Sequence, residues 1–569
     1  MDERFDFVIA GGGHNGSTLA AYLAKSGASV CVVEARPECA GGQENTEPSP
    51  GFRIDPHATY LYGGAAPAFE QLELARYGFR FVPYRSIFGF VTSAGAAVNM
   101  GSRWDQSIGE ESLRAVMGDQ TPFQGLGQLL QGEALRDFLR SMFWTAPYPA
   151  DMDIEPSEVP WVQCLKKMFG DILPDNALDM SLVELLDMTV DYEPLKVAQS
   201  MAAWYCGAHP TWDGQALPSL AGSLLMGYTA GSPRGGMHAY AHSIIRCALA
   251  HGARIITNSE VEEIVVENGR AVGVRLGEAS ATPGRVIRAD KAVISGVDVS
   301  QTFLSLVGRR HLDVGFAQRV SDVNFKGGSL YVASVACREL PRYHGNPEFF
   351  RDEVYPSCVV WPADSYENLY AQTEDVYSRK KVPELSPEIC REHLSMMVCT
   401  HDVYDETRCP DGYRLLSPIY VQLPPTHYDV DGPEGANKVK AELTKAVLDL
   451  LADGAPNMTG DNIVDVWVNT PYDSEFRNAG MVAGNWYGAR QSEDQWFSNR
   501  PLPELARYRT PIDGLYLCNH TSHPGGLCLM AVPYNLMHIL IEDDLVSPGP
   551  WWYPSPWHVT DADRRLAEV

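Results

Sequence analysis

The stretch that decides the fold lies at the start of the chain, where Asp6-Phe7-Val8-Ile9-Ala10 runs directly into Gly11-Gly12-Gly13-His14-Asn15-Gly16. An apolar, β-rich run that ends in a G-x-G-x-x-G turn is the fingerprint of a dinucleotide-binding βαβ unit. Gly11 permits a tight bend, Gly13 lets the backbone approach a pyrophosphate, and Gly16 lets the next helix pack closely on its strand. The start of that helix offers N–H groups and a positive dipole end to the phosphates.

A second apolar run completes the unit. Val30-Cys31-Val32-Val33 precedes Glu34, which stands about twenty residues after the fingerprint, where a carboxylate can accept hydrogen bonds from ribose hydroxyls. A glycine-rich turn alone is weak evidence, but here strand, turn, helix, second strand and acid follow one another in order. We therefore predict a dinucleotide site at this end of the chain.

Two further stretches indicate which dinucleotide. Gly41-Gly42 with Thr46, and then Gly51-Phe52-Arg53-Ile54-Asp55, extend the motif in the way seen in flavoproteins of the glutathione-reductase-like superfamily. Near the end, Gly514-Leu515-Tyr516-Leu517-Cys518 and His523-Pro524-Gly525-Gly526 look like the second flavin-contacting element of that superfamily.

With Arg234-Gly235-Gly236-Met237 and Glu260-Val261-Glu262-Glu263-Ile264, these stretches resemble the phytoene-desaturase-like FAD-dependent oxidoreductases. That group includes carotenoid desaturases, carotenoid isomerases and pyridine-nucleotide-disulfide-oxidoreductase-domain-2 proteins. The sequence departs from the group at His57, two residues after Asp55, and at Leu527, where the group commonly has glycines. Both departures put the usual substrate of the group in doubt more than its cofactor.

The resemblance implies an α/β fold with an α+β substrate region. A Rossmann-type FAD-binding domain of the glutathione-reductase-like superfamily would be interleaved with a mixed substrate domain. We expect FAD-binding segments at residues 1–74, 230–310 and 501–545, substrate segments at 75–229 and 311–500, and an aromatic extension at 546–569. Periodicity predicts helices over 133–142, 181–188, 238–251 and 437–451, strands over 252–256, 329–335 and 415–421, and a hairpin of 261–266 with 272–276 around Asn268-Gly269.

The expected FAD contacts follow from these motifs. They are Gly11, Gly13, His14, Asn15, Gly16, Glu34, Ala35, Arg36, Gly41, Gly42, Val261, Pro524, Gly525, Gly526 and Asn535. Six aromatic residues are candidates for a pocket for a flat substrate, with ordinary core packing as the alternative for each: Tyr60, Tyr62, Trp204, Tyr205, Trp486 and Tyr487.

Two histidines are the candidate catalytic residues. His57 follows the loop expected to reach the reactive face of the flavin, where an imidazole can take a proton as hydride leaves the substrate. His523 precedes the glycine pair near the flavin, with bracing of the loop as the alternative. His520 is a weaker candidate.

Composition limits the function classes. The 569 residues are 45% hydrophobic and carry a formal net charge of −27, so no basic stripe is available to neutralise nucleic acid phosphates. The twelve cysteines form no C-x-x-C pair, so we expect reduced thiols and neither a metal site nor a redox-active pair. The chain start has no basic and apolar leader, and no apolar run is long enough to span a bilayer, so we expect a soluble, cytoplasmic protein.

The function expected from these features is FAD-dependent oxidation. Hydride would leave a small apolar or aromatic organic substrate, by desaturation or C–O or C–N oxidation, and the electrons would pass to dioxygen, a quinone or another acceptor. No second nucleotide fingerprint appears, which argues against NAD(P)H as the routine electron source. Two alternatives stay open: a redox-neutral isomerase, and a non-catalytic binding protein on the same fold, as in the GDP-dissociation inhibitors. The expected partner is a small molecule, and self-association is left open.

Overall fold

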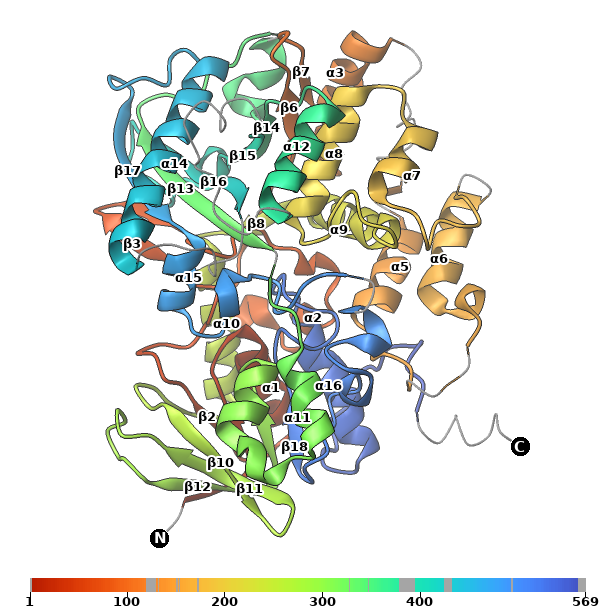
Figure 1. Ribbon diagram of the computed structural model, residues 1–569, viewed down its shortest axis with the longest axis vertical. Helices are drawn as coiled ribbons and strands as arrows, with labels where there is room; N and C mark the ends of the chain where they lie inside the picture. The colour runs from red at the N-terminus through yellow and green to blue at the C-terminus, as the bar shows by residue number, and fades with distance from the viewer. Residues whose placement is uncertain are drawn as a thin grey trace.

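A computed structural model of the chain describes residues 3–118, 129–130, 132–149, 152, 154–170, 173–326, 328–345, 347–377, 394–423, 432–492 and 495–560. Two seven-stranded sheets organise these residues. In Figure 1 the first sheet lies in the lower half of the view and the second in the upper half.

The first sheet is largely parallel. Its strand order is β10-β11-β12-β1-β2-β9, with β18 beside β12. The bounds are β1 (Glu3–Ala10), β2 (Val30–Val33), β9 (Arg254–Ile256), β10 (Val261–Glu267), β11 (Arg270–Leu276), β12 (Val286–Ser295) and β18 (Leu515–Leu517). Strands from three distant stretches of the chain meet here, because Val293 of β12 pairs with Val8 of β1 and with Leu515 of β18.

Both faces of this sheet are covered, which explains why its central strands read as continuous apolar runs. Phe7 and Ile9 of β1 belong to one hydrophobic core, and Val8 and Ala10 belong to another. On the first side, α1 (His14–Lys25) contacts α10 (Met237–Ala250) and α16 (Ala531–Glu542). This arrangement fixes the turn between β1 and α1 at one end of the sheet.

The second sheet is mainly antiparallel and has the order β17-β13-β16-β15-β14-β6-β7. Its bounds are β6 (Gly89–Val91), β7 (Ala97–Asn99), β13 (Ser329–Cys337), β14 (Cys358–Trp361), β15 (Met396–Cys399), β16 (Arg414–Leu423) and β17 (Ile463–Asn469). Helix α14 (Gly432–Gly454) covers one face, and its Leu443, Val447 and Leu451 share a core with Val335 and Ile419 of the sheet.

Shorter elements complete the described part of the fold. The remaining helices are α2 (Ala68–Gln71), α3 (Ser107–Met117), α5 (Glu133–Phe143), α6 (Pro160–Phe169), α7 (Leu182–Thr189), α8 (Glu193–Tyr205), α9 (Ala216–Thr229), α11 (Val314–Ser321), α12 (Tyr366–Tyr377) and α15 (Pro471–Arg477). The remaining strands are β3 (Thr46–Ser49) with β4 (Phe52–Ile54), and β5 (Phe81–Pro83) with β8 (Gly231–Pro233). Among the helices of the described ranges, none combines the length and the apolar composition needed to cross a bilayer.

The helices and strands predicted from periodicity are confirmed. The expected helix over 238–251 is α10, and the expected hairpin is β10 with β11, turning at Asn268 and Gly269. The six-segment domain division stays a prediction. In the C-terminal extension, Trp551 and Trp552 pack on Tyr22 of α1, with ring centroids 6.0 and 5.6 Å away.

Candidate functional site

One cavity of about 650 Å³ connects the end of the first sheet with a cluster of aromatic side chains. Its volume is in the range of cofactor and ligand sites. Five stretches of chain line it: residues 10–15, 33–42, 57–62, 476–487 and 520–528 contribute most of the wall. The cavity therefore joins the predicted dinucleotide end to the predicted substrate end.

At the dinucleotide end, the glycines leave room that a side chain would fill. Gly11 has φ of +99°, and a Cβ on Gly16 would lie 2.2 Å from the carbonyl oxygen of Gly11. A Cβ on Gly41 would lie 3.0 Å from Cα of Gly13, so the two loops touch through backbone alone. Helix α1 starts at His14 with Gly13 as its N-cap and no side chain capping it. Its first N–H groups are therefore available to an anionic pyrophosphate.

Glu34 is held in place by backbone donors. Its Oε2 accepts a hydrogen bond from the Gly12 N–H at 2.7 Å, and its Oε1 accepts one from the Arg36 N–H at 2.8 Å. Each carboxylate oxygen retains lone pairs for further donors, as ribose hydroxyls would be. Glu34, Ala35, Arg36 and Val261 all line the cavity. The glycine cradle, the uncapped helix and this oriented carboxylate together fit FAD.

At the other end of the cavity, aromatic rings form the wall. Five of the six candidates line it, namely Tyr60, Tyr62, Tyr205, Trp486 and Tyr487. Trp204 does not; it is buried and its ring lies 5.5 Å from that of His209. For Trp204 the alternative of ordinary packing is therefore the correct one.

His57 lies in this wall and is paired with a buried carboxylate. Its Nδ1 is 2.8 Å from Oε1 of Glu44, and the two side chains are only 1% and 3% exposed. Glu44 also meets the guanidinium groups of Arg36 at 2.6 Å and Arg477 at 3.1 Å. The structure thus brings the predicted base into a cluster of one acid and two arginines.

The protonation states follow from this cluster. Burial on its own would raise the pKa of Glu44, but the contact with His57 and the positively charged Arg477 outweigh it and hold the pKa well below its usual range. Burial lowers the pKa of His57, against the opposing effect of Glu44. At neutral pH an ionised Glu44 accordingly lies against Nδ1 of a neutral His57, whose Nε2 keeps its lone pair. The Asn469 amide N–H approaches that Nε2 at 3.4 Å, which is too long for a strong hydrogen bond.

The loop that carries His57 is fixed from both sides. Asp55 is buried and forms a 2.6 Å ion pair with Arg408. The Tyr420 hydroxyl, from β16, donates to the carbonyl of His57 at 3.1 Å and lies 2.8 Å from the Thr59 hydroxyl. Arg408 and the β16 residue Tyr420 therefore position this loop.

The structure corrects the position expected for His523. Its ring packs 5.1 Å from Phe497, its Nε2 lies 3.1 Å from the carbonyl of Met142, and it does not line the cavity. Burial lowers its pKa to about 3. The side chain of His523 turns toward the end of α5 and away from the cavity, so His523 braces the loop. His520, the weaker candidate, does line the cavity.

Four expected FAD contacts lie outside the cavity wall: Gly16, Pro524, Gly525 and Asn535. Asn535 donates to the carbonyl of Phe143 at 3.1 Å. Behind Gly525 lies the fully buried Arg500, which donates to the carbonyls of Tyr487 at 2.7 Å and His520 at 3.2 Å. Burial lowers the pKa of Arg500 to about 9, so it remains a cation at neutral pH, placed behind the cavity wall. Gly526 lines the cavity, as do all the expected contacts at Gly11, Gly13, His14, Asn15, Gly41 and Gly42.

Sequence reasoning missed Glu44, Arg477 and Arg500. Glu44 stands two residues after the Gly41-Gly42 pair, and an acidic residue beside a glycine-rich turn is only a weak indication of a functional role. Arg477 is 433 positions away from Glu44, so no local pattern could have joined them.

Comparisons with known proteins bear on the fold and the class of the chain. Residues 9–72 match the model of the NAD(P)-binding Rossmann-like domain, and residues 219–308 match that of the GMC oxidoreductases. Pyridine nucleotide-disulfide oxidoreductase domain-containing protein 2 of Rattus norvegicus is 27% identical, over 95% of this chain and 94% of its own. A limonene dehydrogenase polypeptide of Castellaniella defragrans is 23% identical, over 97% and 96%.

Among solved structures, cyclohexylamine oxidase from Brevibacterium oxydans is similar, with a TM-score of 0.55 and 16% identity, over 96% of this chain and all of that one. The predicted Rossmann-type α/β fold and the resemblance to phytoene-desaturase-like proteins are confirmed. The predicted class is confirmed as well: the chain is an FAD-dependent oxidoreductase.

Proposed function

We propose that the chain removes two hydrogens from a small apolar or aromatic organic substrate, by desaturation or by C–O or C–N oxidation. The electrons then pass to dioxygen, a quinone or another acceptor. The observation that carries the proposal is the aromatic wall of the cavity with the neutral, carboxylate-paired His57 in it. The glycine cradle and Glu34 would hold FAD, which would supply the two-electron hydride acceptor.

Three tyrosine hydroxyls of the aromatic wall already have partners. The Tyr60 hydroxyl donates to the carbonyl of Ser357 at 3.2 Å, the Tyr205 hydroxyl lies 3.2 Å from that of Thr59, and the Tyr487 hydroxyl donates to the carbonyl of Tyr205. Because these polar groups already have partners, an apolar substrate loses no hydrogen bonds by packing on the rings. Such a wall also excludes water from the reacting carbon.

Charge disfavours a cationic substrate. Among the described residues that line the cavity, the carboxylates are Glu34 and Glu260, which adjoin β2 and β10 at the dinucleotide end. The aromatic end thus offers no carboxylate to pair with an ammonium group in the described part of its wall. By its name, the limonene dehydrogenase of Castellaniella defragrans acts on limonene, an apolar hydrocarbon. That relative supports the same substrate class here.

His57 is the proposed proton acceptor. As hydride leaves one carbon, a proton must leave the neighbouring O, N or C atom, and Nε2 of the imidazole is the free base that takes it. Glu44 lies against Nδ1 of the ring and stabilises the imidazolium that forms. Glu44 therefore acts as a positioning residue.

The test is anaerobic bleaching of the purified, yellow holoprotein by a substrate panel of monoterpenes, aromatic alcohols and amines. Bleaching by an apolar or aromatic compound, followed by recovery of colour on adding dioxygen or a quinone, supports the proposal. A protein that carries no flavin, or whose flavin no member of the panel reduces, contradicts it. Anaerobic conversion to an isomer without any acceptor assigns the redox-neutral alternative instead.

A further inference from the structure

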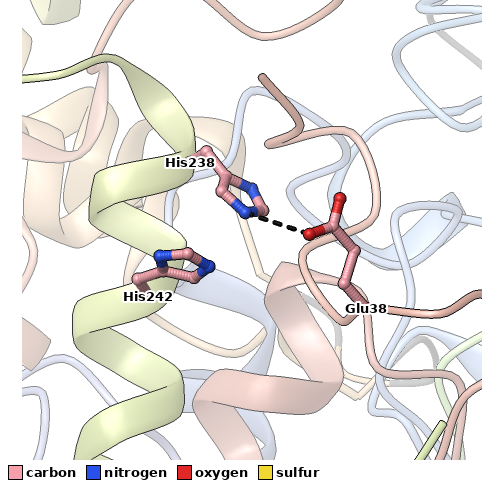
Figure 2. Close-up of side chains that lie close together, drawn as sticks. All are labelled: Glu38, His238 and His242. Atoms are coloured by element: carbon pink, nitrogen blue, oxygen red, sulfur yellow. Dashed lines mark ion pairs between the residues drawn. The ribbon is translucent and has the colours of Figure 1, made fainter. Parts of the chain in front are cut away.

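Three metal-binding side chains converge at a place that the oxidoreductase site does not use. His238 and His242 stand one turn apart on α10, and Glu38 reaches toward them from the loop that follows β2 (Figure 2). Each offers a ligand atom, and these atoms lie within 4.8 Å of one another. None of the three lines the cavity. We propose that Glu38, His238 and His242 bind a divalent transition-metal ion such as Zn²⁺.

The tautomer of His238 prepares it as a ligand. Its Nδ1 is 3.1 Å from the carbonyl oxygen of Gln43. A carbonyl only accepts hydrogen bonds, so Nδ1 carries the proton and Nε2 of the neutral ring carries the lone pair. A metal-bound histidine commonly donates its other N–H to a backbone carbonyl in this manner.

The close contact between His238 and Glu38 requires a proton or a metal ion between the two side chains. Nε2 of His238 lies 3.2 Å from Oε2 of Glu38, and in the neutral tautomer both atoms present lone pairs. Two ligand atoms bound to one tetrahedral Zn²⁺ at its usual bond lengths stand about 3.4 Å apart. The observed spacing is therefore close to that of two ligands that share a metal.

A proton on His238 would also explain that one contact, but not the position of His242. The rings of His238 and His242 lie 4.1 Å apart. Protonation of His238 alone would leave His242 neutral and outside the contact with Glu38, whereas a metal ion uses both rings as neutral ligands. The metal accounts for all three side chains at once.

The ligand set selects the kind of metal. Two imidazoles and one carboxylate suit Zn²⁺, Ni²⁺ or Cu²⁺, whereas Mg²⁺ and Ca²⁺ prefer oxygen ligands throughout. The side chains of His238 and Glu38 are 14% and 48% exposed, so an ion can enter from solvent. The expectation of no metal site rested on the cysteine pattern, whereas the ligands proposed here are two histidines and a glutamate.

The position of the site indicates what the ion would do. Glu38 lies two residues after Arg36, and Gln43 directly follows the Gly41-Gly42 pair; Arg36, Gly41 and Gly42 line the cavity. A metal would tie this loop to α10 without touching the reacting groups. We therefore assign it a structural role beside the cofactor cradle.

The experiment uses the holoprotein freed of any affinity tag. Zn²⁺ binding is measured by calorimetric titration for the wild type, for Glu38→Gln and His242→Gln, and for His251→Gln as a matched control, because His251 directly follows the last turn of the same helix outside the cluster. We expect one Zn²⁺ per chain in the wild type and the control, at least tenfold weaker binding in each cluster variant, and no competition by Mg²⁺.

Equal binding in all four proteins, or no saturable binding by the wild type, overturns the proposal. A second measurement guards against a variant that fails to fold. Zn²⁺ should raise the unfolding temperature of the wild type and of His251→Gln, and leave that of Glu38→Gln unchanged. Because the carboxylate of Glu38 is half exposed, its replacement by the isosteric amide leaves the fold intact, and retention of the flavin checks this directly.

Discussion

At the scale of single residues, the chemistry depends on a buried base whose charge is set by its neighbours. His57 alone would be an ordinary buried histidine, but Glu44 fixes its tautomer, and Arg36 and Arg477 keep Glu44 ionised. The pair resembles other histidine–carboxylate pairs in which the acid orients the ring and stays charged. The two arginines distinguish this pair, because they balance the acid inside the protein.

The first prediction concerns His57 itself. His57→Gln should slow anaerobic flavin bleaching by about 10²–10⁴-fold, the usual contribution of a general base, while the flavin stays bound. Stopped-flow absorbance with the best substrate of the panel measures this rate. The matched control is His523→Gln, which replaces a buried histidine outside the cavity wall and should bleach at the wild-type rate. Equal rates for the two variants would show that His57 lines the cavity but does not act as the base.

The second prediction is a pH profile. Since burial lowers the pKa of His57 below its ordinary 6.5, kcat/KM should stay level through neutral pH and fall only as the imidazole becomes protonated at lower pH. In Glu44→Gln the carboxylate that raises this pKa is lost while Arg477 and Arg36 still lower it, so the acid limb should shift further down. An acid limb that stays in place in Glu44→Gln would show that Glu44 only fills space.

At the scale of elements, local sequence predicted most of what local geometry decides. The β1–α1–β2 unit and the β10–β11 hairpin followed from glycine spacing and apolar periodicity, which act within about twenty residues. In the second sheet, only β13 and β16 were predicted. The strands β6, β7, β14 and β15 are only three or four residues long, too short to show a pattern, and the seven-residue β17 was not predicted either.

The site divides in the same way. Gly11, Glu34 and Gly41 could be predicted because a motif with a fixed spacing holds them. His523 and His520 are three residues apart in one loop, and which of them faces the cavity depends on the packing of α5 and Phe497. Sequence alone does not carry that information, since the contacts of His523 with α5 and with Phe497 join residues distant in the chain.

A prediction at this scale concerns the junction of β1 and α1. In Gly16→Ala, the new Cβ would meet the carbonyl of Gly11 at 2.2 Å, so α1 must move away from the strand. We expect a loss of about 1–3 kcal/mol in the free energy of unfolding, as for other overpacked sites, together with weaker flavin retention. Gly460→Ala is the control, since a Cβ there meets nothing within 4 Å. Flavin absorbance per chain and thermal unfolding measure both effects, and identical values for the two variants would contradict the assigned packing.

At the scale of the whole molecule, the cavity exists because distant parts of the chain meet. The first sheet supplies the cradle, the loop at 57–62 is fastened to β16 of the second sheet, and the wall is closed by residues 476–487 and 520–528. Bringing these parts together buries many histidines. Four buried ones have a pKa lowered by burial to about 3: His209, His401, His523 and His538. His14 and His520 are half-buried in the cavity wall, and their pKa is lowered to about 3 and about 4.

This burial predicts sensitivity to acid. A histidine whose pKa is lower in the folded state stabilises the fold fully above its unfolded pKa of about 6.5, and that contribution is lost as the pH falls toward the folded value. At pH 5 each such histidine lowers the free energy of unfolding by about 2 kcal/mol, because the unfolded chain binds a proton there and the folded chain does not. Asp298 and Asp402 act in the opposite direction, since burial raises the pKa of each to about 6, but they are fewer.

The unfolding temperature, followed by release of flavin fluorescence, should therefore drop steeply between pH 7 and pH 5. A constant unfolding temperature over that interval would mean that these histidines are hydrated in solution and that the closed packing around the cavity is wrong.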